Sequence, residues 1–331
     1  MNSYFAPTRR NLVGGLIAAP SLLLSTTRGS LADTYPDKLV RFVCAWPAGS
    51  GLDIWVRRLV DHIRPLIGQP CIVENKPGAA GNIATEYVAR SKPDGYTIYV
   101  QSASGIAANM FMLKNPPIDA TKALINVSML ARFVFYLVVA ADSPFKSLSD
   151  VVDHVRKKGN KASYGTGSSN SRLLGALLNE IMGLNAVEIQ YRPGPEMAND
   201  LISGAVDYMF MDGVLARAFE RGGRVRILAS GGKERLQMDG DLPTMIESGV
   251  PGLYAPGSFG ILVPVGTPRP VMEKINAWAN EALKVPAAIE FIRSTGGEPM
   301  TVSVDEAQSM FLQTTDEWRE LVKRSKIEPQ G

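Results

Sequence analysis

Short β-branched apolar runs alternate along the chain with longer stretches whose apolar residues recur at helical spacing. The apolar runs predict strands at 39–46, 71–74, 96–101, 135–140, 161–164, 187–191, 206–211, 225–229 and 259–263. The amphipathic stretches predict helices at 52–67, 82–91, 147–158, 172–182, 196–203, 214–221, 270–283, 287–294 and 304–323. Residues 102–134 are less regular, and most of that segment yields no defined element.

Strands that alternate with helices of this length indicate βαβ units and mostly parallel sheets. These strands are too many for one sheet followed by three C-terminal helices. We therefore expect an α/β protein of two lobes, each with a mostly parallel sheet flanked by helices. Lobe 1 is expected to comprise residues 33–136 and 257–331, with residues 137–256 inserted as lobe 2.

The N-terminal segment predicts export. Residues 1–32 contain the pair Arg9 and Arg10 and no acidic residue, followed by an apolar run at 12–24 and small residues up to Ala32. This pattern is typical of a signal peptide cleaved near Ala32, and the apolar run is too short to span a bilayer core of about 30 Å. A buried N-terminal helix is the alternative. The arginine pair resembles a twin-arginine signal, so the general secretory and twin-arginine routes both stay open.

Charge argues against a nucleic-acid partner. The 331 residues are 45% hydrophobic, which is enough to bury the cores of about two domains of roughly 150 residues each. Removing the three arginines of residues 1–32 from 35 Lys and Arg leaves 32, which equals the 32 Asp and Glu. A neutral exported chain lacks the basic footprint that nucleic acids require.

Loops of small residues follow several predicted strands, at 47–51, 77–82, 102–105, 165–170 and 212–213. In open α/β sheets, ligands bind outside the carboxyl ends of the strands. Glycine lets backbone amides approach a ligand closely, and helix N-termini favour anions. Although such loops also simply form turns, their repeated position predicts an amide-lined cleft between the lobes, suited to a small carboxylate.

The sequence offers no convincing catalytic or cofactor motif. His62 and His154 are the only histidines, and both lie in predicted helices. Residues 49–54 and 165–170 begin like a dinucleotide-binding loop but lack its third glycine, and no P-loop is present. Cys44, His62 and Cys71 lack the spacing of a structural metal site. We expect no enzyme activity, no metal and no cofactor.

The two cysteines are expected to be buried free thiols. Cys44 lies near the end of the first predicted strand, and Cys71 begins the second. If these strands are parallel neighbours, the two residues lie at opposite ends. A disulfide requires Cα atoms within about 7 Å of each other.

The segment from Pro47 to Asp53, P-A-G-S-G-L-D, resembles the P-A-G-G-x-x-D segment of the Bug receptors. These receptors are the periplasmic solute-binding proteins of tripartite tricarboxylate transporters. The resemblance covers essentially all of residues 35–328. It continues, in order, through 73–83, 93–97, 164–165, 200–201, 204–210, 241–244, 248–252 and 264–268.

The resemblance implies a type II-like periplasmic binding protein whose lobes close on the ligand like a flytrap. It further implies a periplasmic monomer, without stable membrane insertion, that delivers a small organic acid to the membrane permease subunits of a tripartite transporter. The residues that it places at the ligand are Pro47, Ala48, Gly49, Ser50, Asp53, Gly78, Gly81, Asn82, Ser102, Ser104, Thr166, Ser168, Ser169, Arg172 and Asp212.

Three departures from the family pattern affect the choice of ligand. Arg172 stands where the family often has histidine, and it either pairs with a second carboxylate or faces solvent. Ser258 replaces a frequent tryptophan, which would enlarge or reshape the cleft. Met211 stands where aspartate is frequent and leaves Asp212 as the nearest acid.

Other interpretations stay open at this point. Asp53 either caps the helix that starts near Leu52 or accepts a hydrogen bond from a ligand ammonium or hydroxyl. A receptor that reports ligand to a sensor protein would have the same fold and site. A secreted α/β enzyme acting on a carboxylate is a further alternative, although it would need a nucleophile and a base.

Overall fold

The structure is a computed structural model that describes residues 35–192 and 196–329. The expected signal peptide, residues 1–32, lies outside the described residues. Among the helices of the described ranges, none combines the length and the apolar character needed to cross a membrane.

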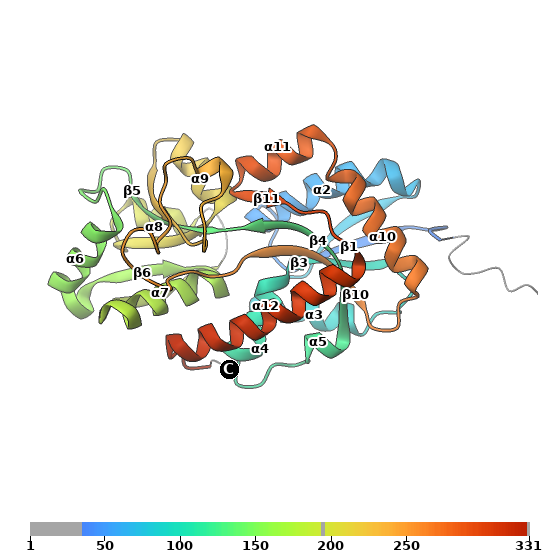
Figure 1. Ribbon diagram of the computed structural model, residues 1–331, viewed down its shortest axis with the longest axis horizontal. Helices are drawn as coiled ribbons and strands as arrows, with labels where there is room; N and C mark the ends of the chain where they lie inside the picture. Colours follow the sequence, from blue (N-terminus) through green and yellow to red (C-terminus); the bar gives the residue numbers. More distant parts are fainter. Residues whose placement is uncertain (1–34, 193–195, 330–331) are drawn as a thin grey trace, which may run out of the picture.

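Two sheets lie side by side, each flanked by helices (Figure 1). The first has the spatial order β11–β4–β10–β3–β1–β2, and the second the order β7–β6–β8–β5–β9. We call the first sheet with its helices lobe 1 and the second sheet with its helices lobe 2. The strands of lobe 1 are β1 (Val40–Cys44), β2 (Cys71–Asn75), β3 (Thr97–Ser102), β4 (Leu124–Phe133), β10 (Ser258–Pro264) and β11 (Gly297–Pro299). Those of lobe 2 are β5 (Phe135–Ala140), β6 (Ser163–Thr166), β7 (Val187–Gln190), β8 (Tyr208–Asp212) and β9 (Val225–Ser230).

The helices follow the strands of their own lobe in sequence. Lobe 1 carries α2 (Gly51–Ile67), α3 (Asn82–Ala89), α4 (Ala103–Met112), α5 (Ala120–Ala123), α10 (Arg269–Ala282), α11 (Pro286–Ser294) and α12 (Val304–Ser325). Lobe 2 carries α6 (Leu148–Lys158), α7 (Ser169–Met182), α8 (Met197–Ile202) and α9 (Gly213–Arg221). Short 3₁₀ turns occur at η1 (Ala79–Gly81), η2 (Gly159–Lys161) and η3 (Gln237–Asp239).

The two-lobe α/β fold is confirmed, but the sheets are mixed and not mostly parallel. β1 pairs in parallel with β2 and β3, and β6 pairs in parallel with β7 and β8. β4, β5, β10 and β11 form antiparallel pairs. β5 and β10 are the strands by which the chain enters lobe 2 and returns to lobe 1, and each runs antiparallel to both of its neighbours. Each follows a strand of the other sheet, so no helical crossover within its own sheet makes it parallel to a neighbour.

The irregular segment 102–134 contains elements that the sequence did not predict. It forms α4, α5 and the long strand β4. Inside β4, Asn126 and Ser128 are fully buried polar residues that interrupt the apolar run. The Asn126 backbone amide donates to Gln308 Oε1 (2.8 Å) and its side chain donates to the Ala307 carbonyl (3.3 Å), both on α12. Partners distant in sequence therefore make this strand possible.

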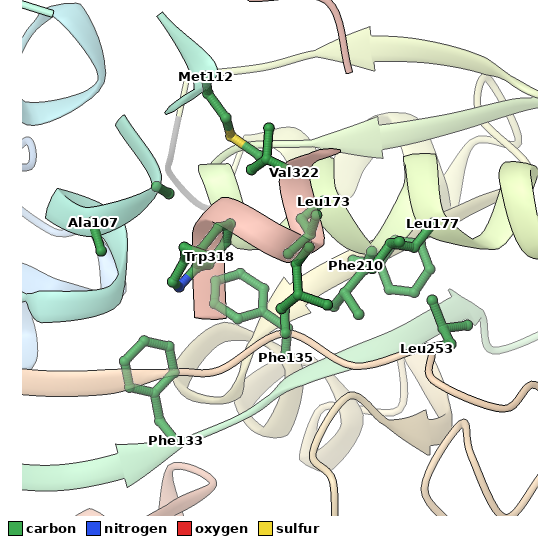
Figure 2. Packing of buried hydrophobic residues seen from close by; sticks show 14 of the residues in the cluster. Ala107, Met112, Phe133, Phe135, Leu173, Leu177, Phe210, Leu253, Trp318 and Val322 are labelled. Atoms are coloured by element: carbon green, nitrogen blue, oxygen red, sulfur yellow. The ribbon is translucent and has the colours of Figure 1, made fainter. Parts of the chain in front are cut away.

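Helix α12 ties the two lobes together. It runs along both lobes in Figure 1 and contacts α4 of lobe 1 and α7 of lobe 2. Its Trp318 is fully buried. Figure 2 shows this side chain among Phe133 from β4 and Phe135, Leu173 and Phe210 from lobe 2. The largest hydrophobic core is therefore continuous across the lobe boundary beside α12.

Strand register keeps the two cysteines apart. Val40 pairs with Cys71 and Cys44 with Asn75, so the cysteines lie at opposite ends of the β1–β2 pair. Both are free, as expected. Cys44 is buried, but Cys71 is only half-buried because β2 forms an edge of its sheet.

We predict that the two thiols differ in reactivity. Burial raises the pKa of the Cys44 thiol to about 12, so very little of the reactive thiolate forms near pH 8. Burial also raises the pKa of Cys71, but its side chain is partly accessible. A thiol titration of the native protein should label Cys71 before Cys44, and the denatured, unreduced protein should yield both thiols. Finding no free thiol after denaturation would contradict this prediction.

Candidate functional site

Two adjoining cavities lie between the lobes, where β1, β3, β6 and β8 end. The inner cavity has a volume of about 90 Å³, and the outer cavity about 600 Å³. They share five lining residues: Trp46, Ala80, Gly167, Ser168 and Ser169. Because these residues come from both lobes, the two cavities form one cleft with a narrow inner end and a wide outer end.

Four helices, α2, α4, α7 and α9, begin at the inner cavity. Each is capped by a side chain that accepts a hydrogen bond from the amide three residues further on: Ser50 (3.3 Å), Ser102 (3.0 Å), Ser168 (3.3 Å) and Asp212 (3.1 Å). The first two amides of a helix have no partner within it, and a helix N-terminus attracts negative charge. The cleft is therefore suited to an anion, although no Lys, Arg or His lines the inner cavity in the described ranges.

Aromatic side chains form much of the inner wall. Trp55 on α2 lies against Phe259 on β10 with ring centroids 4.7 Å apart, and Phe133 stacks on Phe259 at 4.3 Å. Trp46, Phe135 and Phe210 line the same cavity. Sequence reasoning missed these residues because an aromatic residue in or beside a strand usually belongs to the core.

Asp212 is the charged residue of the inner lining in the described part of the chain. Burial raises the pKa of its carboxyl group, against the lowering effect of the Leu215 and Val214 amides. Across the cleft the carboxylate approaches Gly51 so closely that a Cβ there would lie 2.5 Å from Oδ1. A Cβ on Gly213 would likewise overlap the Thr295 carbonyl of lobe 1. Two glycines therefore permit the lobes to meet here.

The outer cavity is bounded by a strained loop. Ala79 (φ 46°) and Ala80 (φ 53°) both adopt the left-handed conformation, which is uncommon for non-glycine residues. Asn82 donates to the Ala79 carbonyl (2.9 Å), and Asn109 donates to the Ala80 carbonyl (2.7 Å). The Ser169 hydroxyl donates to Asn109 Oδ1 (3.1 Å) from the opposite lobe. Asn109 thus connects the loop to lobe 2. It was missed because α4 was not predicted.

Asp53 supports the loop after β1. The N-cap of α2 is Ser50, so of the two alternatives left open for Asp53 the capping of this helix is wrong. The Asp53 carboxylate accepts hydrogen bonds from the Gly49 amide (2.9 Å), Asn75 Nδ2 (2.8 Å) and Arg57 Nε (3.0 Å). It lines neither cavity.

The other expected site residues divide between the two cavities. Ser50, Ser102 and Asp212 line the inner cavity, and Ser168 and Ser169 line both. The outer cavity alone is lined by Pro47, Gly78, Gly81, Thr166 and Arg172. Besides Asp53, the residues that line neither are Ala48, Gly49, Asn82 and Ser104.

The structure shows which groups surround the three residues that depart from the family pattern, Arg172, Ser258 and Met211. Arg172 Nε pairs with Glu188 Oε2 (3.3 Å) on β7, and Thr166 donates to the other oxygen of Glu188 (2.7 Å). Ser258 is buried, and its amide donates to the Ser104 hydroxyl (3.4 Å). Met211 lines the inner cavity next to Asp212. Within the described ranges, no group of three or more His, Cys, Asp or Glu residues is arranged to hold a metal ion.

Comparisons with known proteins agree with this architecture. The family model described as tripartite tricarboxylate transporter family receptor matches residues 55–327. The chain is 31% identical over 324 residues to a UPF0065 protein of Bordetella bronchiseptica, covering 97% of this chain and 95% of that protein.

Two solved structures are similar over most of the chain. The periplasmic binding protein BugD has a TM-score of 0.81 and 31% identity, covering 89% of this chain and all of that one. R. palustris Rpa4515 with adipate has a TM-score of 0.84 and 26% identity, covering 89% of this chain and 99% of that one.

We predict that Asp53→Asn destabilises the protein in a pH-dependent way. Burial opposes ionisation, but hydrogen bonds from Arg57, Asn75 and the Gly49 amide hold the pKa of Asp53 below its ordinary value. A carboxyl group with a lowered pKa stabilises the fold above its unfolded pKa of about 3.9, and this contribution is lost as the pH falls through the folded pKa. The variant should lose about 1–3 kcal/mol at pH 7.

Urea unfolding at pH 7 and near pH 3 tests this expectation. The difference between wild type and Asp53→Asn should shrink at the lower pH. Asp61→Asn is the matched control, because Asp61 lies on the same helix in an exposed pair with Arg64 (3.3 Å) and should change stability by less than about 0.5 kcal/mol. A pH-independent loss in Asp53→Asn would contradict the electrostatic role.

Proposed function

The chain belongs to the tripartite tricarboxylate transporter receptor family, and we propose that it captures a small organic carboxylate between its lobes and delivers it to the membrane permease subunits of a tripartite transporter. The family consists of solute-binding receptors, and structural relatives such as BugD are periplasmic binding proteins. In this proposal the chain is exported with a signal peptide cleaved near Ala32.

The observation that carries the proposal is the convergence of four helix N-termini on one cleft between the lobes. First-turn amides and the Ser168 hydroxyl group supply hydrogen-bond donors for a carboxylate, and the Ser169 hydroxyl becomes a further donor when it releases Asn109. A relative with the same fold is known with adipate bound, which supports a carboxylate in this cleft. Ordered water would complete the coordination, since cations are absent from the inner lining of the described chain.

Opening and closing of the lobes would admit the ligand. The lobes meet closely at Gly213 and Thr295, and the hydrogen bond between Ser169 and Asn109 also crosses the cleft. These contacts lie beside the inner cavity, so their separation would widen the path by which a ligand enters it. Hinge closure of two lobes around a ligand is a common device of binding proteins.

We predict that carboxylates raise the melting temperature of the purified protein. A ligand at 100 times its dissociation constant stabilises the folded state by about 2.7 kcal/mol. A thermal-shift panel should include mono-, di-, tri- and aromatic carboxylates, with the corresponding amides and neutral sugars as controls. Stabilisation by sugars and by no acid would reject the proposed ligand class.

We further predict that Gly213→Ala weakens binding without unfolding the protein. The new Cβ would overlap the Thr295 carbonyl and hold the lobes apart. Affinity for an acid identified by the panel should fall at least about tenfold, which corresponds to about 1.4 kcal/mol. The melting temperature without ligand should change little, because opening of the cleft relieves the overlap.

Gly222→Ala is the matched control for this measurement by calorimetric titration. Gly222 follows the same helix α9, and a Cβ there would make only ordinary contacts at 3.5 Å. Its affinity should equal that of the wild type. Full affinity in Gly213→Ala would show that closure at this contact is not needed.

A further inference from the structure

The inner end of the cleft is built for an apolar group. The rings of Trp55 and Phe133 each lie against the ring of Phe259, and the three form one wall of the inner cavity. Trp55 is 2% exposed and Phe133 is 8% exposed, so water has little access to this wall. Figure 2 shows the neighbouring Phe133 and Phe135 at the junction of the lobes. Apolar surface that water reaches poorly favours an apolar ligand group.

The charges around the cleft disfavour a second carboxylate at the inner end. Among the described residues that line the inner cavity, Asp212 is the one with an ionisable side chain, and its charged form is negative. A second negative charge beside it would be repelled, and low hydration strengthens that repulsion. The two arginines of the cleft, Arg172 and Arg192, line the outer cavity instead, and Arg172 already pairs with Glu188.

Asp212 also orients the ligand. It lines the inner cavity but not the outer one, so its charge disfavours the ligand carboxylate at the inner end. The residues common to both cavities include Ser168 and Ser169, which begin helix α7 and supply first-turn amides and the Ser168 hydroxyl group. The ligand carboxylate is therefore best accommodated where the cavities join.

Volume limits the apolar group. The inner cavity measures about 90 Å³, whereas an apolar protein cavity of about 150 Å³ accommodates benzene. A short branched aliphatic chain fits this space, a single ring requires slight adjustment of the walls, and fused rings exceed it.

We propose that the ligand is a monocarboxylate with a compact apolar tail, whose carboxylate lies where the two cavities join and whose tail occupies the inner cavity. This inference rests on the proposed function and names the ligand class of the same site.

The affinities of matched acids test this assignment in calorimetric titrations of the purified protein. Isovalerate or benzoate should bind at least tenfold more tightly than glutarate, adipate or 2-naphthoate, and isovaleramide should not bind. Equal or tighter binding of glutarate or adipate would overturn the inference while supporting the proposed function. Equal or tighter binding of 2-naphthoate would overturn the size limit. Binding of none of these acids would overturn the inference alone, and stabilisation by another carboxylate of the thermal-shift panel would then still support the proposed function.

Asp212→Asn tests the charge argument separately. Asparagine is also a good N-cap, so the start of α9 should be preserved. The preference for isovalerate over glutarate should fall at least fivefold in this variant. Asp153→Asn removes the same charge from an exposed position on α6 in the same lobe and should leave the preference unchanged. An unaltered preference in Asp212→Asn would overturn the role of Asp212 in excluding a second carboxylate.

Discussion

Helices α2, α4, α7 and α9 all begin where the lobes face each other, and the proposed binding of a carboxylate depends on their N-termini. Their capping side chains, Ser50, Ser102, Ser168 and Asp212, stand at or shortly after strand ends. All four residues start a helix and line the cleft, and Ser102 and Asp212 also end a strand. Partial positive charge from the first-turn amides replaces the cations that the inner cavity lacks in the described chain.

The contacts between the lobes differ on the two sides of the molecule. Beside α12 the hydrophobic core is continuous, and Trp318 packs with residues of both lobes (Figure 2). At the cleft, the lobes meet through close backbone approaches at Gly51 and Gly213 and through the hydrogen bond from Ser169 to Asn109. The continuous core beside α12 resists separation there, so we expect the lobes to open at the cleft.

Much of the fold could be predicted from the sequence, because the spacing of apolar residues depends on the local secondary structure. The strand at 135–140 and the helix at 52–67 correspond closely to β5 and α2. β4 was missed because Asn126 and Ser128 interrupt its apolar run, and their burial, with the bond from Asn126 to the Ala307 carbonyl of α12, arises only in the tertiary structure. At the site, loop composition pointed to residues such as Ser50 and Ser168, but periodicity cannot distinguish a core aromatic residue from one such as Phe259 that lines a cavity.

A crystal structure of the protein with isovalerate or benzoate would test most directly whether backbone amides, and not a cation, hold the ligand. The carboxylate oxygens should accept hydrogen bonds from first-turn amides and the hydroxyl groups of Ser168 or Ser169, with every Lys and Arg beyond about 4 Å. A carboxylate paired with the Arg172 guanidinium, after Glu188 has been displaced, would contradict the account.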